Sequence, residues 1–421
     1  MKTTHVEEEI EQAEPSRAPA LGGATGSDVE ETPAEALIKE ARRRQRRRYA
    51  ATAVVVVLAT GLVAGLLLTV GNSGTTSNTT VPSAPKVAIQ SLTFPGPFVP
   101  MQVVSTSGAV WVLGTNQAAA HGGCSIEEVD PATLRTQMFP IPACGDYLSV
   151  GKGLIYIAAD IPAVNGNSDD LHLEVFDPAT SRATVMAPVM ITTQGSGRAH
   201  MDMTYGAGSI WMTYWGSELV QISPSTGAVL QRIANAPQSV GGHGTIVAND
   251  GGLWIAEGAG SPADIYRLAP GSQRFSKIYN GPARGSVLWL SSIGTKTWAA
   301  IATYGENDEM ASSQLVAFDF SGKKVIETAN EQFGDVPLVG SGAELWSVGS
   351  GAKCSAPQQL WMIDSETGGS SYVTTLRTPV EPCLTESPTT SQMTVVNGSI
   401  FILEATGTTS PPAVLHRVRA A

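Results

Sequence analysis

Residues 87–421 alternate short apolar stretches with tight polar turns, and one such stretch recurs seven times. Each copy follows small turn residues and continues as an apolar run that contains one aromatic side chain. The aromatic positions are Trp111, Tyr156, Trp211, Trp254, Trp298, Trp346 and Phe401. They are separated by 45, 55, 43, 44, 48 and 55 residues. A period of about 40 to 50 residues built from short apolar runs indicates a repeated unit of several short strands.

A second sequence pattern follows most copies of the first. In it, an apolar run ends in turn residues. Examples are Asp130-Pro131, Asp177-Pro178, Ser223-Pro224 and Asp364-Ser365. Asp and Ser cap such turns, and Pro presets φ. Each repeat therefore predicts four antiparallel strands, which is one blade of a β-propeller. The predicted fold class is all-β, a seven-bladed β-propeller preceded by a single transmembrane helix.

The seventh repeat is incomplete at the end of the chain. Its third strand falls at residues 414–418, and the chain ends at Ala421 before a fourth strand can form. Residues 87–94 form a spare strand at the other end of the domain. We expect this strand to complete the last blade, because a shared blade removes an exposed edge and ties the two ends together.

The first 86 residues lack the repeat and predict a membrane anchor. Residues 49–70 are uncharged, and as a helix they would span roughly 33 Å, enough to cross a bilayer. Six arginines in residues 42–48 hold that end on the cytoplasmic side. A cleaved signal peptide is the alternative, but its charged region would be unusually long and no small-residue cleavage motif follows. We therefore expect an uncleaved signal-anchor.

Three further segments flank the anchor. Residues 1–31 predict a disordered acidic cytoplasmic tail, because they hold few large apolar side chains. Residues 32–48 predict a basic juxtamembrane helix that Thr32 and Glu35 cap at its start. Residues 71–86 are rich in Ser, Thr, Asn, Pro and Gly and predict a flexible spacer. The expected localisation is the cell membrane, single-pass, with the N-terminus cytoplasmic and the propeller extracellular.

The charge of the chain lies on the repeat domain. Residues 1–86 hold 10 Lys and Arg and 10 Asp and Glu, whereas residues 87–421 hold 16 and 27, which leaves the formal net charge of −11 on the second part. Such a domain does not neutralise phosphates, so a nucleic-acid partner is excluded. The charge favours cationic or neutral partners.

The four cysteines, Cys124, Cys144, Cys354 and Cys383, lie in the part expected outside the membrane, where disulfide bonds persist. Cys124 and Cys354 follow the second strands of blades 1 and 6, and Cys144 and Cys383 follow the fourth strands of the same blades. Because these connections leave an antiparallel blade on one face, we predict the pairs Cys124–Cys144 and Cys354–Cys383. A metal site is the alternative, but no paired C-x-x-C is present.

The long connections predict which face carries the function. Second-to-third and fourth-to-first connections are long, whereas the others are tight, and function usually lies on the elaborated loops of a rigid scaffold. Eleven residues before the aromatic position lie His200, His243 and Asp335, where the innermost strand is expected to begin. Two histidines and a carboxylate could bind a metal or transfer protons. The alternative is a polar channel lining that meets only water.

Neighbouring loop residues could form the wall of a pocket at the same mouth of the channel. These residues are Tyr214, Trp215, Glu257 and Tyr304. By contrast, the repeat places an aromatic residue in every second strand regardless of ligand, so these aromatic side chains are predicted to be blade core. The candidate catalytic residues are thus His243, His200 and Glu257, and the candidate ligand-binding residues are Asp335, Trp215, Tyr214 and Tyr304.

The outer domain resembles the extracytoplasmic propellers related to virginiamycin B lyase and the NHL and YVTN-type repeat proteins. The resemblance rests on residues 242–246, which contain His243-Gly244, on residues 252–257, which end in Trp254-Ile255-Ala256-Glu257, and on residues 265–268. The family implies a seven-bladed ring. For the lyase it implies a magnesium-dependent ring-opening elimination that uses histidines and a glutamate from adjacent blades. The next repeat carries Arg284-Gly285-Ser286 where a second His-x-Gly would stand.

The sequence thus predicts a binding or scaffold module at the cell surface, anchored like membrane proteins of high-GC Gram-positive bacteria, which it resembles in style. Its partner would be an extracytoplasmic protein or a small ligand, with membrane lipid contacted through the anchor. No cofactor is expected for this function. The alternative is a lyase or hydrolase acting at the channel mouth, for which a divalent metal would be needed. Signalling from the propeller to the tail is a third hypothesis.

Overall fold

The structure, a computed structural model of the chain, describes most of the repeat domain. The described residues are 87–94, 96, 98–106, 108–116, 123–142, 145–162, 169–189, 202–214, 218–237, 245–257, 262–306, 310–329, 338–341, 343–350, 358–377, 391–404 and 413–420. Internal contacts divide the chain into two units, Met1–Val81 and Pro82–Ala421. The predicted tail, juxtamembrane helix, membrane span and spacer all lie outside the described residues. Within the described ranges, no helix is long and apolar enough to cross a bilayer.

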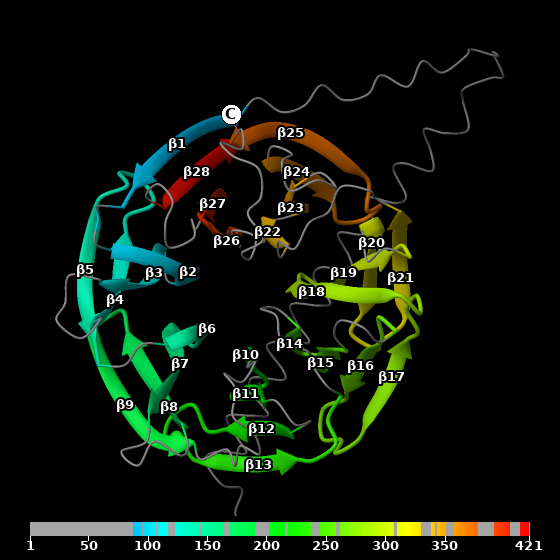
Figure 1. The fold of residues 1–421 in the computed structure, drawn as a ribbon, viewed down its shortest axis with the longest axis horizontal. Helices are drawn as coiled ribbons and strands as arrows, with labels where there is room; N and C mark the ends of the chain where they lie inside the picture. Colours follow the sequence, from blue (N-terminus) through cyan, green and yellow to red (C-terminus); the bar gives the residue numbers. More distant parts are fainter. Residues whose placement is uncertain are drawn as a thin grey trace, which may run out of the picture. The chain divides into compact units, whose positions relative to one another are not determined.

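The described residues form seven four-stranded antiparallel sheets arranged in a ring, which confirms the predicted propeller (Figure 1). In every blade the strands follow one another outward from the centre. Blade 1 contains β2 (Phe98–Thr106), β3 (Ala109–Asn116), β4 (Gly123–Val129) and β5 (Thr136–Ile141). Blade 2 contains β6 (Gly145–Gly151), β7 (Leu154–Pro162), β8 (Asp169–Asp177) and β9 (Arg182–Val189). Blade 3 contains β10 (Asp202–Gly206), β11 (Ser209–Tyr214), β12 (Glu218–Ile222) and β13 (Val229–Ile233).

The remaining blades repeat this order. Blade 4 contains β14 (Ile246–Asn249), β15 (Gly252–Ala256), β16 (Ile265–Leu268) and β17 (Phe275–Tyr279). Blade 5 contains β18 (Gly285–Ile293), β19 (Lys296–Tyr304), β20 (Met310–Asp319) and β21 (Lys324–Ala329). Blade 6 contains β22 (Val339–Ser341), β23 (Glu344–Ser350), β24 (Gln358–Asp364) and β25 (Ser370–Arg377). Blade 7 contains β26 (Ser391–Val396), β27 (Ser399–Glu404), β28 (Val414–Ala420) and, from the start of the domain, β1 (Val87–Thr93).

The ring closes through pairing of its two ends, as the incomplete seventh repeat predicted. Strand β1 lies antiparallel to β28, with a continuous register from Val87 opposite Ala420 to Thr93 opposite Val414. Directly after β1, the side chain of Phe94 is buried and its ring lies 5.5 Å from that of Phe98 in blade 1. The N-terminal strand therefore covers the outer edge of β28 and leads into the core between blades 7 and 1.

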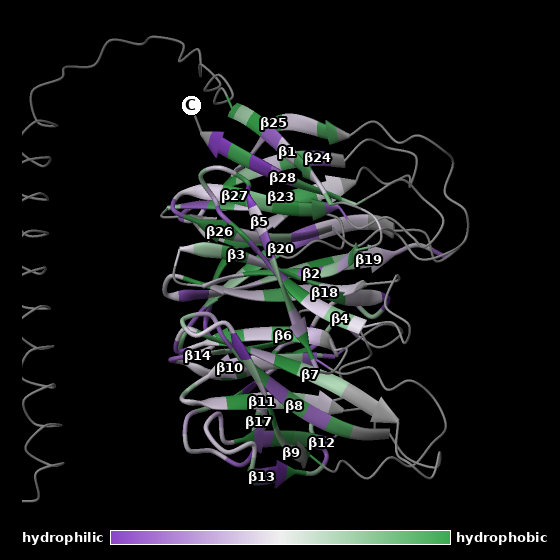
Figure 2. Ribbon diagram, turned by 90° about the vertical axis from the view of Figure 1, so that its left-hand side faces the viewer, coloured by the Kyte–Doolittle hydropathy of each residue, from purple (hydrophilic) through white to green (hydrophobic). Residues whose placement is uncertain are grey.

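The core lies between neighbouring blades. The aromatic residue of each second strand packs against an adjacent blade, and the side chains of Trp111, Trp254, Trp298 and Trp346 are buried, which confirms their assignment to the blade core. Figure 2 shows apolar residues within the strands and many hydrophilic residues at the turns. Burial on both sides explains why the blade residues 252–256 form a continuous apolar run rather than an alternating one.

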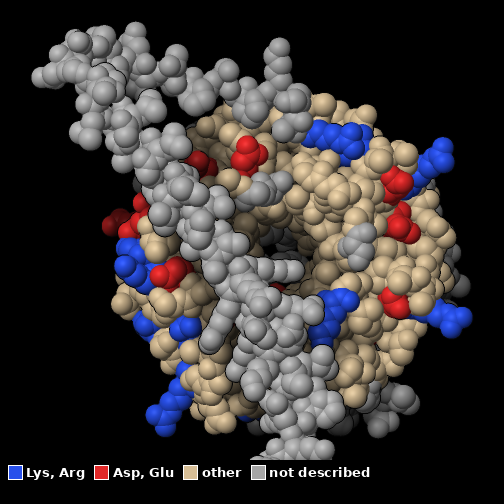
Figure 3. All heavy atoms as spheres, turned by 180° about the vertical axis from the view of Figure 1, so that it is seen from behind, with Lys and Arg blue, Asp and Glu red and all other residues tan. Residues whose placement is uncertain are grey.

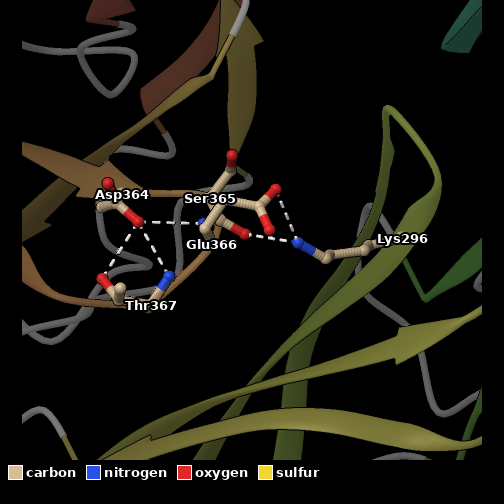
Figure 4. A network of polar contacts seen from close by, with 5 residues as sticks. All are labelled: Lys296, Asp364, Ser365, Glu366 and Thr367. Atoms are coloured by element: carbon tan, nitrogen blue, oxygen red, sulfur yellow. Dashed lines mark hydrogen bonds and ion pairs between the residues drawn. The ribbon is translucent and has the colours of Figure 1, made fainter. Parts of the chain in front are cut away.

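Tight turns join the first strand to the second and the third to the fourth. In blade 7, Asn397 and Gly398 occupy a two-residue hairpin loop with φ of 49° and 72°. Both values lie in the left-handed region that a type I′ turn requires and that Asn and Gly tolerate best. In blade 6, Asp364 Oδ1 accepts hydrogen bonds from the backbone N–H groups of Glu366 (2.9 Å) and Thr367 (2.7 Å) (Figure 4). The polar residues that follow the third strand thus form an Asp-capped turn.

Strand pairing reaches into the long connections. β7 and β8 continue to the pair Pro162 opposite Asp169, which shortens the connection between them. Cys124 lies inside β4 rather than in a loop, opposite Thr115 and Ile141. Strand pairing extended these elements beyond the residues whose local sequence predicts a strand.

Candidate functional site

The structure describes three of the seven candidate catalytic and ligand-binding residues, one of them only in its backbone. Glu257 and Tyr304 are described with their side chains, and Tyr214 is described as the last residue of β11, opposite Glu218. The other four, His200, His243, Trp215 and Asp335, lie outside the described residues. The long-connection face, where second-to-third and fourth-to-first connections leave the blades, is therefore described in part, chiefly at blades 4 and 5.

Glu257 comes directly after the second strand of blade 4 and lies in a network of ionisable side chains. Its Oε2 accepts a hydrogen bond from the hydroxyl of Tyr266 at 3.0 Å. Tyr266 follows a register shift between Ile265 and itself, and lies opposite Lys277 on the fourth strand. The Lys277 ammonium lies 5.4 Å from the centre of the Tyr266 ring. Three strands of one blade therefore supply an acid, a phenol and an ammonium in a row.

The buried side chain of Asp264 pairs with Lys277 at the end of this row. Lys277 Nζ forms an ion pair with Asp264, whose side chain is almost completely buried. Asp264 Oδ1 also accepts a hydrogen bond from the backbone N–H of Gly281, at 3.3 Å, in the connection to blade 5. The hydrogen bond to Asp264 raises the pKa of Lys277, and burial raises the pKa of Tyr266, with the hydrogen bond to Glu257 adding to the rise. At neutral pH the ammonium stays charged and the phenol stays protonated.

Tyr304 lies at the equivalent end of blade 5. Its backbone N–H donates a hydrogen bond to the carbonyl oxygen of Arg284 at 2.8 Å. The Arg284 guanidinium in turn donates to the carbonyl oxygen of Glu306 at 3.3 Å. Blades 4 and 5 therefore place Glu257 and Tyr304 at the ends of corresponding second strands, on the long-connection face.

Hydrogen bonds between innermost strands join the blades close to this face. Nine residues before the aromatic position, a side-chain oxygen accepts a hydrogen bond from the backbone N–H of the next blade. Gln392 accepts from Val103 (2.9 Å) and Gln102 accepts from Leu148 (2.7 Å). Asp202 of blade 3 likewise accepts a hydrogen bond from the backbone N–H of Ile246 of blade 4, at 3.0 Å. The same register position thus fastens three of the blade boundaries.

Asp202 differs from the two glutamines because it can ionise. Its side chain is 5 % exposed, and Oδ2 also accepts hydrogen bonds from the backbone N–H of Thr245 (2.6 Å) and from its hydroxyl (3.0 Å). The N–H of Met203 donates to Oδ1 at 2.9 Å. Burial nevertheless raises the pKa of Asp202 to about 7, because desolvation of the carboxylate exceeds the effect of these donors. The Asp202 carboxyl group, between blades 3 and 4, therefore exchanges its proton near neutral pH.

The structure describes one of the four cysteines, Cys124. Cys124 is buried in β4 and is disulfide-bonded. Cys144, Cys354 and Cys383 lie outside the described residues, so both pairings stay predictions.

The metal site that the lyase resemblance implies is described only at Glu257, because His200 and His243 lie outside the described residues. Glu257 is the one member of the implied set that the structure places, and its described partner is the Tyr266 hydroxyl. Within the described ranges, no three His, Cys, Asp or Glu side chains cluster closely enough to hold a metal ion. This part of the face can present hydrogen-bond donors, acceptors and one ammonium group to a ligand.

Sequence reasoning missed Asp202, Asp264, Tyr266 and Lys277 as members of this site. A signal for Asp202 exists, since polar residues stand nine positions before the aromatic in blades 1, 3, 4 and 7. Tyr266 and Lys277 carry no comparable signal, because their contact depends on the register of β16 and β17 after the bulge.

Comparisons with known proteins support the fold and leave the family open. No protein-family model matches the chain, and no curated protein matches it significantly. A crystal structure of the WD40 repeats of RRP9 superposes with a TM-score of 0.51 at 8 % sequence identity, covering 80 % of this chain and 99 % of that one. At this identity the likeness establishes the β-propeller fold alone. Because 974 chains of solved structures match significantly, the architecture does not single out an activity.

Proposed function

We propose that the protein is a membrane-anchored propeller that binds a partner outside the cell through its long-connection face. The observation that carries this proposal is the difference between the two faces of the ring. Short hairpins such as the one at Asn397 and Gly398 lie on one face. The other face carries the long connections and the network around Glu257. A closed, rigid ring with one elaborated face is suited to presenting a binding surface.

The anchor is proposed from the N-terminal sequence. An uncharged segment at residues 49–70 follows six arginines, which favours a single-pass arrangement with a cytoplasmic N-terminus. The propeller would then stand outside the membrane on the spacer of residues 71–86. Disulfide bonds persist in that environment, and the disulfide-bonded state of Cys124 is compatible with it.

The charge of the domain limits the chemistry of the partner. The propeller part carries 27 acidic and 16 basic residues. On the face that Figure 3 shows, the described acidic and basic side chains are interspersed around the ring and form no single basic patch. A cationic or neutral protein segment, or a small ligand of that kind, is therefore favoured over nucleic acid.

Site-specific photo-crosslinking tests the binding face. A photoreactive residue placed at Asn280 or Glu306, both exposed on the long-connection face, should crosslink a partner in intact cells. The matched control is Ala179, which is exposed in the third-to-fourth turn of blade 2 on the opposite face. Adducts at Asn280 and Glu306 but not at Ala179 would support the proposal. Equal crosslinking at all three positions, or adducts at Ala179 alone, would contradict it.

A further inference from the structure

Three polar side chains of blade 7 form a row that crosses the ring closure. The hydroxyl of Ser91 in β1 lies 2.8 Å from Nδ1 of His416 in β28. Nε2 of the same imidazole lies 3.3 Å from Oε2 of Glu404 at the end of β27. Glu404 and His416 are buried, whereas Ser91 is exposed on the outermost strand. The row therefore runs from a buried carboxylate through an imidazole to a hydroxyl at the surface.

The same three register positions carry the network of blade 4. Glu257 and Glu404 each stand three residues after the aromatic of the second strand. Tyr266 and His416 each lie opposite the residue that follows this aromatic, and Lys277 and Ser91 lie opposite them on the fourth strand. The positions are thus equivalent, with different chemistry in the two blades.

The blade architecture does not require polar groups at these positions. The third-strand position of His416 is filled by Val220 in blade 3 and by Val316 in blade 5, and both valines are buried. Burying an imidazole and a carboxylate is costly unless they pair, whereas valine packs there without that cost. Blades 1 and 2 place buried carboxyl groups, Glu127 and Glu174, at the same third-strand position. What distinguishes blade 7 is an imidazole that reaches a surface hydroxyl, that of Ser91, at 2.8 Å.

The protonation pattern of the row follows from its order. With the imidazole proton on Nε2, His416 presents an N–H group to the carboxyl group of Glu404 3.3 Å away, although the two atoms lack hydrogen-bond geometry. Nδ1 then carries the lone pair and accepts the hydroxyl proton of Ser91. A nucleophile within hydrogen-bond reach of a base, with the base oriented by a third group, is the arrangement that activates serine for covalent catalysis.

We propose that Ser91, His416 and Glu404 form an esterase site on the outer strand of blade 7, which takes small carboxylic esters. The row lies at the same end of blade 7 as the Glu257 network does in blade 4, and ester hydrolysis there is a different function from partner binding. Because the nucleophile lies on an exposed edge strand, the site suits a small acyl group rather than a substrate that needs deep burial. Strand β1 is the outermost strand of its sheet, so alternate backbone N–H groups along it are not paired within the sheet.

The chemical steps balance as in other acyl transfers. Ser91 Oγ attacks the ester carbonyl carbon while its proton moves to His416 Nδ1, and Glu404 stabilises the imidazolium. The tetrahedral adduct expels the alcohol, which takes the proton from His416 and leaves an acyl group on Ser91. A water molecule then gives a proton to Nδ1 and attacks the acyl carbon. The bond to Oγ breaks, Oγ regains the proton, and the carboxylic acid departs.

A covalent probe tests this site directly. The full chain is treated with a fluorophosphonate, which phosphonylates activated serines with loss of fluoride, and the adduct is located by peptide mass spectrometry. The expected result is an adduct on Ser91 that is absent in Ser91→Ala. Hydrolysis of p-nitrophenyl acetate should fall roughly 100-fold, to the rate of the uncatalysed reaction, in the same variant. An unlabelled Ser91 in the folded wild-type chain would overturn the proposal.

Two further variants separate activation of Ser91 from its exposure. Glu404→Gln keeps the size of the side chain but removes its charge, so probe labelling of Ser91 should slow by about tenfold or more. Ser276→Ala is the matched control, because Ser276 is exposed on the fourth strand of blade 4 and its hydroxyl bonds to the carbonyl oxygen of Arg267. Thermal melts establish that each variant is folded. Unchanged labelling in folded Glu404→Gln would show that Ser91 is not activated by this row and would contradict the proposal.

Discussion

Asp202 and Thr245 meet across the boundary between blades 3 and 4, where the Asp202 carboxylate accepts the backbone N–H of Thr245 at 2.6 Å and its hydroxyl at 3.0 Å. At equivalent positions, Gln102 and Gln392 fasten other boundaries with a neutral amide. An ionisable group at this position makes the blade 3–4 boundary sensitive to pH, whereas the glutamine boundaries are not.

The first prediction concerns the pH dependence of this boundary. Burial raises the pKa of Asp202 from 3.8 to about 7. Between these values the folded state holds a proton that the unfolded state has released, so the free energy of unfolding falls as the pH rises through this window. The slope is on the order of 1.4 kcal/mol per pH unit at most, and it vanishes above about pH 7. Denaturant unfolding at pH 4.5 to 8 gives the free energy of unfolding of the wild type and of Asp202→Asn. The difference between these two free energies should change with pH by the predicted slope.

The control for this prediction is Gln102→Glu, which introduces the same chemistry at the equivalent position of blade 1. We expect the free energy of unfolding of this variant to fall more steeply with rising pH than that of the wild type, because the new carboxyl would also be buried. A difference between wild type and Asp202→Asn that stays constant across the whole pH range would show that Asp202 is ionised throughout.

The second prediction concerns ring closure. Phe94 is buried against Phe98 and the core between blades 7 and 1. Truncating it should lower the free energy of unfolding by about 3 to 5 kcal/mol, because a large cavity opens beside the closing strand. Ile89 in β1 is 38 % exposed, so Ile89→Ala should cost much less. Equal losses in chemical denaturation would mean that Phe94 does not secure the closure.

A third prediction concerns the Asp-capped turns. Backbone and side-chain hydrogen bonds from Thr367 hold the pKa of Asp364 below its ordinary value of 3.8. The carboxylate therefore contributes stability above pH 3.8, and this contribution is lost as the pH falls through the lower folded-state pKa. Asp364→Ala should lower Tm at pH 7, and its difference from wild type should shrink below about pH 4. A Tm difference that grows on acidification would have the wrong sign.

A fourth prediction concerns the network of blade 4. Tyr266→Phe keeps the ring beside Lys277 but removes the hydroxyl that Glu257 accepts. We expect the free energy of unfolding to fall by about 1 kcal/mol, as for one side-chain hydrogen bond. Tyr372→Phe is the control, because this exposed hydroxyl bonds only to Thr375 among the described residues. Comparable losses in urea melts of the two variants would indicate that the Glu257 contact has no special strength.

The blades and the closure were predictable because their signals are local and repeated. An aromatic such as Trp254 must be buried wherever it occurs in a second strand, and an Asp-Pro turn such as that at Asp130 ends a strand in the same way in several repeats. The unpaired strand at residues 87–94 followed from counting, since a four-stranded blade with three strands leaves an open edge.

The candidate site was much less predictable, because its contacts join residues of separate blades or depend on a register shift. Asp202 and Ile246 are 44 residues apart, and the position that joins them holds Gln, Asp or Thr in different repeats. Lys277 lies opposite Tyr266 only because a register shift between β16 and β17 sets their pairing. Ser91 and His416 come from opposite ends of the domain. No short sequence window contains these pairs.

Surface labelling of lysines in intact cells tests the central claim, that the chain presents its propeller outside the membrane. An amine-reactive reagent that cannot cross membranes should modify Lys324, which is exposed in blade 5, and should leave Lys39, before the proposed span, unmodified. Both lysines should react after the cells are permeabilised. Labelling of Lys39 with protection of Lys324 in intact cells would place the propeller inside and contradict the account.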